Sequence, residues 1–94
     1  MAKPYLLSNE AIADIDCIIQ NVVDYTGYTS SGIKLYQEIF DKFELISLLP
    51  KSGRMRHDGM REIFARSYRI VYQECNDYIR IIAVIHARRL YPRP

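Results

Sequence analysis

The 94-residue sequence lacks any apolar run of the roughly 18 residues that a membrane-spanning helix requires. Only Leu6 and Leu7 form an apolar pair before polar residues begin, so we expect no signal peptide. The two cysteines, Cys17 and Cys75, show no CxxC pairing and no metal-ligand spacing, which favours free thiols in a reducing compartment. These absences predict a cytoplasmic protein that does not associate with membranes.

The usual catalytic signatures are also missing. The sequence contains no Gly-x-Ser-x-Gly, no Walker A pattern and no Rossmann glycine pattern. His57, His86 and Cys75 match no known metal spacing, so we predict no metal and no cofactor. His86 remains open to two interpretations, because a histidine after a strand is either a general acid or base or a buried hydrogen-bonding residue.

Arginine is absent from the first half of the chain. Residues 1–50 contain three lysines against seven acidic residues, a net charge of −4, whereas residues 51–94 contain ten basic residues against four acidic ones, a net charge of +6. Arginine forms forked contacts to carboxylates and phosphates that lysine cannot form. The asymmetry indicates a cationic surface for an acidic or anionic macromolecule, with a merely solvated sheet face as the alternative.

Two amphipathic helices are predicted in the first half. Apolar residues recur at a spacing of three and four between Ala11 and Val23. Ser8 or Asn9 caps this helix, and Gly27 stops it. A second helix from about Ser31 to Leu49 is apolar on more than one face, so we expect it to contact both the first helix and a sheet. A link of about four to six residues then predicts an antiparallel αα-hairpin.

One strand is predicted before these helices and three after them, in the order β-α-α-β-β-β. A short strand covers Pro4–Leu7, a polar loop Lys51–Gly59 follows the helices, and Met60–Arg66 is a strand. Ser67–Gln73 and Tyr78–Ile85 form a hairpin, and the second of these is apolar enough to lie in the middle of the sheet with both faces partly covered.

The predicted fold class is therefore α+β. It consists of an N-terminal strand, an antiparallel αα-hairpin and a three-stranded antiparallel meander, in one domain spanning residues 1–94.

Candidate binding residues gather at two places in the second half. Arg54, Arg56, His57 and Arg61 lie within eight residues and suit a phosphate or a carboxylate, unless they form only a solvated basic loop. The last predicted strand leads directly into His86, Arg88 and Arg89, and Arg69 lies inside the strand before it. Tyr68 and Tyr72 are expected to pack in the core rather than stack on bases, whereas Tyr91 in the tail is expected to be the freest tyrosine.

The order and spacing of four segments resemble the toxins of the ParE/RelE superfamily, the toxin halves of bacterial type II toxin–antitoxin pairs. These segments are Leu48–Arg54, Met60–Glu62, Ser67–Tyr72 and Val84–Arg89. The resemblance covers nearly the whole chain and implies the same β-α-α-β-β-β fold.

The resemblance implies two possible activities, because the superfamily divides by target. RelE-like members are ribosome-dependent endonucleases that cut mRNA, with cationic side chains and an acid–base group around the phosphate. Carried over by residue, Arg69 matches the arginine of the Tyr-Arg-x-Val-Tyr strand, Arg88 matches the arginine after the last strand, and His86 is the candidate acid–base group. The RelE-type tyrosine would fall near Pro94 and the RelE lysine pair has no clear match, so this set is incomplete.

ParE-like members are a closer resemblance, through the Pro-x-x-Gly-Arg loop and the His-x-Arg-Arg sequence after the last strand. They are implied to poison DNA gyrase and so to block replication. We therefore predict a gyrase-inhibiting toxin rather than an enzyme. The alternatives are an mRNA endonuclease acting at the ribosome, a non-toxic protein-interaction domain and a nucleic-acid-binding domain.

The resemblance also implies a cognate ParD-like antitoxin and a hetero-oligomer with it. Such an antitoxin wraps the toxin with an acidic, partly disordered segment that folds on binding. We expect acidic antitoxin side chains to meet several arginines, Arg61, Arg69, Arg88 and Arg89. The predicted antitoxin- or target-binding set comprises Arg54, Arg56, Arg61, Arg69, His86, Arg88, Arg89 and Tyr91. Deletion of the tail, Leu90–Pro94, is predicted to weaken toxicity more than antitoxin binding.

Overall fold

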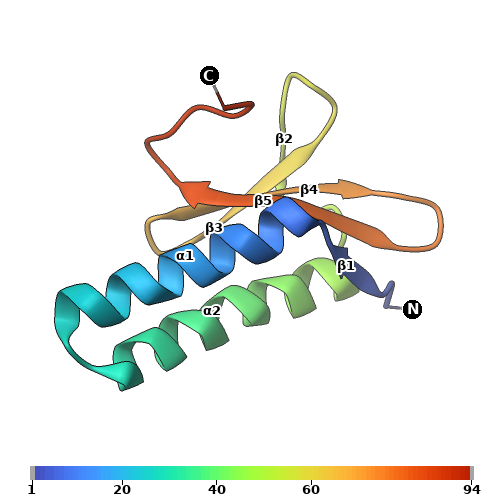
Figure 1. Cartoon of the computed structure of the whole chain (residues 1–94). Helices are drawn as coiled ribbons and strands as arrows, with labels where there is room; N and C mark the ends of the chain where they lie inside the picture. Colours follow the sequence, from blue (N-terminus) through green and yellow to red (C-terminus); the bar gives the residue numbers. More distant parts are fainter. Residues whose placement is uncertain (1, 94) are drawn as a thin grey trace.

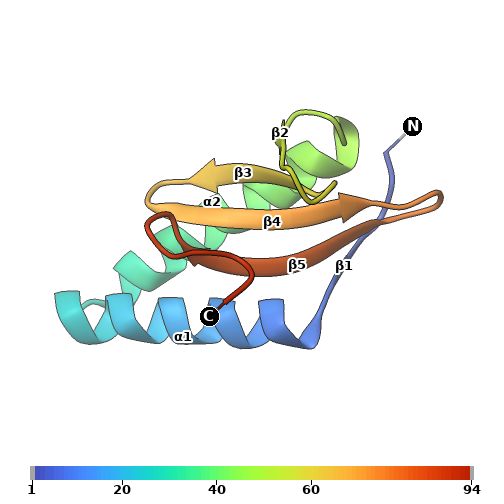
Figure 2. The ribbon, with the colours of Figure 1, turned by 90° about the horizontal axis from the view of Figure 1, so that it is seen from above.

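The computed structural model describes residues 2–93, in which two helices cover one face of a five-stranded sheet (Figure 1). The elements are β1 (Tyr5–Leu7), α1 (Asn9–Thr26), α2 (Thr29–Leu48), β2 (Arg54–Met55), β3 (Arg61–Ala65), β4 (Tyr68–Glu74) and β5 (Ile79–His86). The arrangement confirms the predicted α+β fold. The C-terminal tail lies on the side of the sheet opposite the helices, and Figure 2 shows it running back across β5.

The sheet has the strand order β1-β5-β4-β3-β2. β1 is parallel to β5, and all other neighbours are antiparallel, so β3, β4 and β5 form the predicted meander with β5 in an interior position. The prediction of a strand-free loop over Lys51–Gly59 was wrong, because Arg54 pairs with Glu62 and Met55 with Arg61. A strand of two residues is too short to produce a periodic pattern.

The two helices form the predicted antiparallel hairpin, with a tighter connection than expected. The Ser8 hydroxyl accepts the Ala11 N–H at 3.0 Å, and α1 ends at Gly27 in the left-handed conformation, with φ of 74°. α2 already begins at Thr29, so its N-cap is Tyr28, which makes no side-chain cap bond. The left-handed Gly27 turns the chain, so the connection is only two residues long. The prediction of four to six residues was therefore too long.

The main core fills the space between the helices and the sheet. It is built from fully buried residues of both layers, including Leu35, Ile39, Phe43, Ile70, Tyr72 and Ile81. The buried Tyr72 hydroxyl donates to the Pro50 carbonyl at 2.7 Å and accepts the Gly53 N–H at 2.9 Å, which fixes the chain just before β2. Tyr68 is half-buried against the same core, so the packing predicted for both tyrosines is confirmed.

A second, smaller apolar cluster lies on the outer face of the sheet, the face away from the helices. Val71, Ala83 and Ile85 form it, and Met60, Ile82 and Tyr91 pack against it. The last strand is therefore covered on both faces for part of its length, as its apolar sequence predicted.

A β-bulge determines which face each residue of β5 occupies. Val71 pairs with Ala83 and Tyr72 with Ile81, so Ile82 is an extra residue between these two pairs. Ile81 lies in the main core before the bulge, and Ala83 lies in the outer cluster after it. The bulge therefore shifts the alternation of β5 by one residue.

Candidate functional site

Three arginines surround one buried carboxylate on the outer face of the sheet. The Glu62 side chain is only 4% exposed. Its Oε2 lies 2.6 Å from Arg54 Nη2, its Oε1 lies 2.7 Å from Arg56 Nη1, and Arg69 Nε lies 3.9 Å from Oε2. We call this group, together with Met55, His57, Leu90 and Tyr91, the arginine cleft, which encloses about 320 Å³.

The strand register explains why these side chains meet. Arg54 on β2 pairs with Glu62 on β3, and Glu62 pairs with Val71 on β4, whose side chain belongs to the outer cluster. Arg69 lies two residues before Val71 and therefore shares its face. Sequence reasoning missed Glu62. The available signal was an acidic residue inside a predicted strand, directly before two apolar residues, Ile63 and Phe64.

Arg56 connects the cleft to the C-terminal tail. Its side chain is 6% exposed, and its Nε and Nη2 donate to Asp58 Oδ2 at 3.1 Å and to the Tyr91 carbonyl at 2.8 Å. Its guanidinium lies 5.5 Å from the centre of the Tyr91 ring. Tyr91 is thus half-buried, and burial raises the pKa of its hydroxyl. The expectation that Tyr91 is the freest tyrosine was wrong, because the tail folds back onto the sheet.

The arginines keep Glu62 ionised. Burial alone would raise the pKa of the Glu62 carboxyl, but hydrogen bonds from Arg54 and Arg56 and the charge of Arg69 outweigh it and lower that pKa. Burial also opposes ionisation of Asp58, whose pKa is nevertheless lowered by the Met60 N–H and by Arg56. The site is therefore a fixed network of opposite charges.

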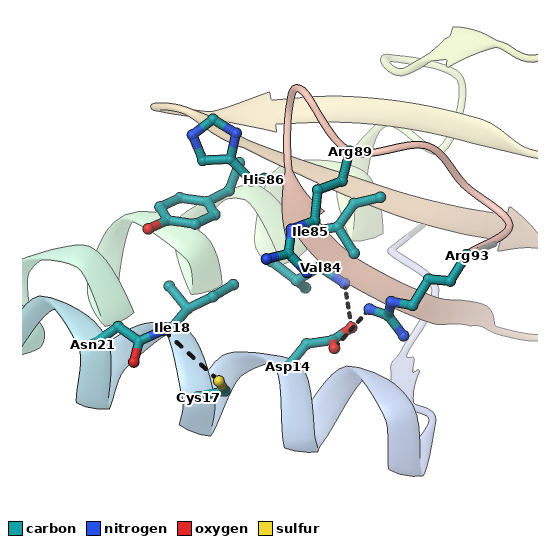
Figure 3. Close-up of a pocket in the computed structure, with 10 residues that line it drawn as sticks. Asp14, Cys17, Ile18, Asn21, Val84, Ile85, His86, Arg89 and Arg93 are labelled. Carbon is teal, nitrogen blue, oxygen red and sulfur yellow. Dashed lines mark hydrogen bonds and ion pairs between the residues drawn. The ribbon is translucent and has the colours of Figure 1, made fainter.

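A second cleft of about 290 Å³ lies between α1, the end of β5 and the tail (Figure 3). Asp14, Cys17 and Asn21 line it from α1, and Val84, Ile85, His86, Arg89 and Arg93 line it from the other side. The His86 ring packs edge-on against Tyr68 at 5.8 Å between centroids, and its Nδ1 accepts the Arg88 N–H at 3.2 Å. Only Nε2 of His86 then remains for a ligand or a proton transfer.

The structure separates Arg69 from His86. Arg69 pairs with Ile85 in the outer cluster, whereas His86 pairs with Tyr68, which packs against the main core. Because neighbouring side chains of a strand point to opposite faces, Arg69 and His86 lie on opposite faces of the sheet. Arg69 Nη2 donates to the Ala87 carbonyl at 2.6 Å, so it holds the backbone next to the exposed Arg88.

The other predicted residues are distributed as follows. Arg54, Arg56, His57, Arg69 and Tyr91 meet in the arginine cleft, and His86 and Arg89 meet in the second cleft. Arg61 lines neither cleft, and its Nη1 donates to the Gly53 carbonyl at 2.8 Å. Within residues 2–93 no three His, Cys, Asp or Glu side chains come together as metal ligands, and neither helix there is long and apolar enough to cross a membrane.

The chain is thus a small α+β protein with a two-helix layer on one face of a five-stranded sheet, and all nine of its arginines lie in its second half. A family model described as ParE toxin of type II toxin-antitoxin system, parDE, matches residues 5–91, so the chain belongs to that family. A solved structure described as a chromosomal ParDE TA system from P. aeruginosa has the same fold, with a TM-score of 0.78. The two chains are 18% identical over 90% of this chain and 96% of the other. No curated protein sequence matches significantly.

Proposed function

We propose that this ParE-family toxin inhibits DNA gyrase, that it thereby blocks replication, and that a cognate ParD-like antitoxin neutralises it. The match of the ParE model to residues 5–91 supports this proposal. The whole chain acts as one toxin domain, and a gyrase target places its action in the cytoplasm. The toxin works by binding rather than by covalent catalysis.

The separation of Arg69 from His86 is the observation that favours a binding toxin over the alternative mRNA endonuclease. A nuclease of the RelE kind would need Arg69, His86 and Arg88 around one phosphate. Arg69 instead lies beside the buried Glu62 on the outer face, and His86 lies at the second cleft. A carboxylate next to a catalytic arginine also opposes the approach of a phosphate, because the two charges repel.

The exposed surface suits the antitoxin proposed here. Arg88 and Arg89 are exposed at the end of β5, and Arg54 is 73% exposed at the rim of the arginine cleft. Large apolar side chains are exposed on the helical hairpin, among them Tyr25, Tyr28, Ile33 and Tyr36. An acidic, amphipathic segment would neutralise the first group and cover the second.

Pulse labelling after brief induction of the chain tests the proposed target. Incorporation of thymidine and methionine is followed in parallel in cells that lack the antitoxin. Thymidine incorporation should stop first, while methionine incorporation continues. An early stop in methionine incorporation would instead support mRNA cleavage, and no change in either label would leave a non-toxic interaction domain.

A matched pair of variants connects the result to the exposed arginines. Arg88→Ser combined with Arg89→Ser should restore thymidine incorporation, because these exposed side chains belong to the predicted antitoxin- or target-binding set and we assign them to the gyrase contact as well. Arg66→Ser combined with Arg80→Ser removes the same charge from two exposed arginines elsewhere on the surface and should leave the inhibition intact. Equal effects of both changes would show that only overall charge matters.

A further inference from the structure

Two backbone carbonyls after β5 are bonded by arginines whose side chains are largely buried. Arg69 Nη2 donates to the Ala87 carbonyl at 2.6 Å, and Arg56 Nη2 donates to the Tyr91 carbonyl at 2.8 Å. We call the segment that begins and ends at these bonds, residues 87–91, the anchored loop. Its two ends are fixed to the sheet by one side chain from β4 and by another from the residue after β2.

The backbone between these two ends is also bonded. The Ala87 N–H donates to the Ser67 carbonyl at 2.7 Å, and the Arg89 N–H donates to the His86 carbonyl at 2.9 Å. The Arg88 N–H donates to Nδ1 of the same histidine at 3.2 Å. Connecting segments at a protein surface are usually mobile, because water satisfies most of their backbone groups. The anchored loop instead has bonds within the chain at consecutive N–H groups and at the carbonyls of both ends, so we expect a single backbone conformation.

The buried Glu62 carboxylate connects the two anchors. Its Oε1 lies 2.7 Å from Arg56 Nη1, and its Oε2 lies 3.9 Å from Arg69 Nε. Because Glu62 is only 4% exposed, a guanidinium that turned away from it would weaken the compensation of a buried charge. The same carboxylate also accepts a bond from Arg54, but within residues 2–93 no hydrogen bond joins Arg54 to the anchored loop. The network thus contains two arginines that hold the loop and one that does not.

The middle of the anchored loop is exposed, whereas its anchors are not. Arg88 and Arg89 are exposed, and Leu90 is 73% exposed. By contrast, the side chain of Arg56 is 6% exposed and that of Arg69 is 19% exposed. A partner molecule therefore reaches the middle of the loop far more easily than the side chains that hold it.

We propose that residues 88–90 contact an acidic surface of gyrase and that the anchors hold them in one conformation for this contact. Arg56 and Arg69 are then positioning residues, connected through Glu62, rather than contact residues. The identity of the partner rests on the proposed function, whereas the fixed conformation of the loop does not. Two guanidinium groups beside a leucine suit acidic side chains around an apolar depression on the partner. A loop that is ordered before binding loses little conformational entropy on binding, which increases the affinity.

Backbone amide relaxation, measured by NMR on the full-length chain, tests the anchoring without gyrase. The amides of residues 88–90 should have the order parameters of rigid backbone, about 0.85. Arg69→Met removes the bond to Ala87 and should lower these values below about 0.6, the range of flexible backbone. Arg54→Met is the matched control, since it also removes an arginine from Glu62 but leaves both anchors in place. It should not change the order parameters of the loop.

Inhibition of DNA supercoiling by purified gyrase tests the contact. Arg69→Met should raise the concentration of the chain needed for half inhibition by about tenfold, because a loosened loop must be ordered on binding. Arg80→Met removes the same charge from an exposed position of β5 outside the loop and should leave that concentration unchanged. Circular dichroism checks the fold of each variant. If Arg69→Met does not fold, the order parameters of the unmodified chain decide the case, because the anchoring requires a rigid loop there.

Different results would overturn different parts of the proposal. Flexible residues 88–90 in the unmodified chain, or equal loosening by Arg69→Met and Arg54→Met, would overturn the anchoring. Weaker inhibition by Arg69→Met with a loop that stays rigid would make Arg69 a contact residue. Equal weakening by Arg69→Met and Arg80→Met would show that only overall charge matters. A rigid loop on a chain that does not inhibit gyrase would overturn the proposed target and leave the anchoring in place.

Discussion

The Asp14 carboxylate accepts the backbone N–H of Val84 at 2.9 Å and so joins the first helix to the last strand. Its other oxygen accepts Arg93 Nη2 at 2.7 Å, and Arg93 Nη1 also lies 3.0 Å from Glu10. One acidic side chain of α1 thus holds both β5 and the tail. Because Val84 is buried, its N–H depends on this carboxylate as an acceptor.

Asp14→Ala is expected to lower the free energy of unfolding by about 1–3 kcal/mol, because it leaves a buried backbone N–H without an acceptor. Urea denaturation measures the loss. Asp16→Ala removes an exposed acid from the same helix and should change stability by less than about 0.5 kcal/mol. Similar losses in the two variants would mean that helix charge, rather than the bond to Val84, is responsible.

Glu62→Gln is expected to cost about 3–5 kcal/mol of stability, because it leaves the charges of Arg54, Arg56 and Arg69 without their buried counterion. The control is Glu38→Gln, which breaks the exposed ion pair with Arg66 and should cost less than about 1 kcal/mol. Chemical denaturation of both variants gives the comparison. A loss at Glu62 no larger than that at Glu38 would contradict the role assigned to the network.

Acid should destabilise the protein through Glu62. The arginines outweigh burial and hold the native pKa of Glu62 below its ordinary value of 4.5. Its contribution is therefore complete above that pH and is lost as the pH falls through the lower native pKa. Denaturation curves collected between neutral and strongly acidic pH should show a steeper loss for the unmodified chain than for Glu62→Gln. Parallel curves would assign the acid sensitivity to other carboxylates.

Tyr72→Phe is expected to destabilise the protein by about 1–3 kcal/mol, because the Gly53 N–H and the Pro50 carbonyl lose their buried partner. Thermal unfolding detects the change. Tyr25→Phe is the matched control, since Tyr25 is 92% exposed and its hydroxyl should contribute nothing measurable. A neutral Tyr72→Phe would indicate that water replaces the hydroxyl in the loop before β2.

Removal of the tail, residues 90–94, is expected to weaken growth arrest more than antitoxin binding. Of these residues, Pro94 lies outside the part of the chain that the structure describes. The deletion also uncovers the outer cluster, because Tyr91 packs there and Arg93 pairs with Asp14. Growth of induced cells and co-purification with the antitoxin measure the two effects. Arg93→Ala serves as the control, because it removes the ion pairs of the tail with Glu10 and Asp14 and leaves Leu90 and Tyr91 in place. Full growth arrest by the truncated chain would make the tail dispensable.

The helices, the meander and most of the core could be predicted from the sequence, because each depends on the local spacing of apolar residues. Apolar residues at helical spacing define α1, and Gly27 marks its end correctly. The strand pair β2 and β3 could not be predicted in this way, since the pairing of Arg54 with Glu62 depends on residues eight positions apart and on a strand of two residues. The same limitation hid the buried carboxylate.

The positions of the candidate site residues could not be predicted from their spacing in the sequence, because they depend on the strand register, a β-bulge and the path of the tail. Sequence spacing put Arg69 and His86 near the open end of one hairpin, but only the register, with Arg69 opposite Ile85 and Tyr68 opposite His86, shows that they lie on opposite faces. The bulge at Ile82 is not visible in a strand that is apolar at nearly every position. Tyr91 was misjudged because a tail that folds back is stabilised by Arg56, a contact over 35 residues.

The contacts made by Ser8 and Asp14 also affect whether sheets of two copies of the chain can pair through their edges. β1 pairs with β5 for three residues only, and beyond it the Ser8 hydroxyl donates to the Ile82 carbonyl while Asp14 accepts the Val84 N–H. At the opposite edge β2 is two residues long. Because both edges are short and the side chains of Ser8 and Asp14 already bond the backbone of β5, few backbone groups remain free to pair with a strand of another molecule. We therefore expect concentrated solutions of the chain to resist fibril-like aggregation through the edges of the sheet.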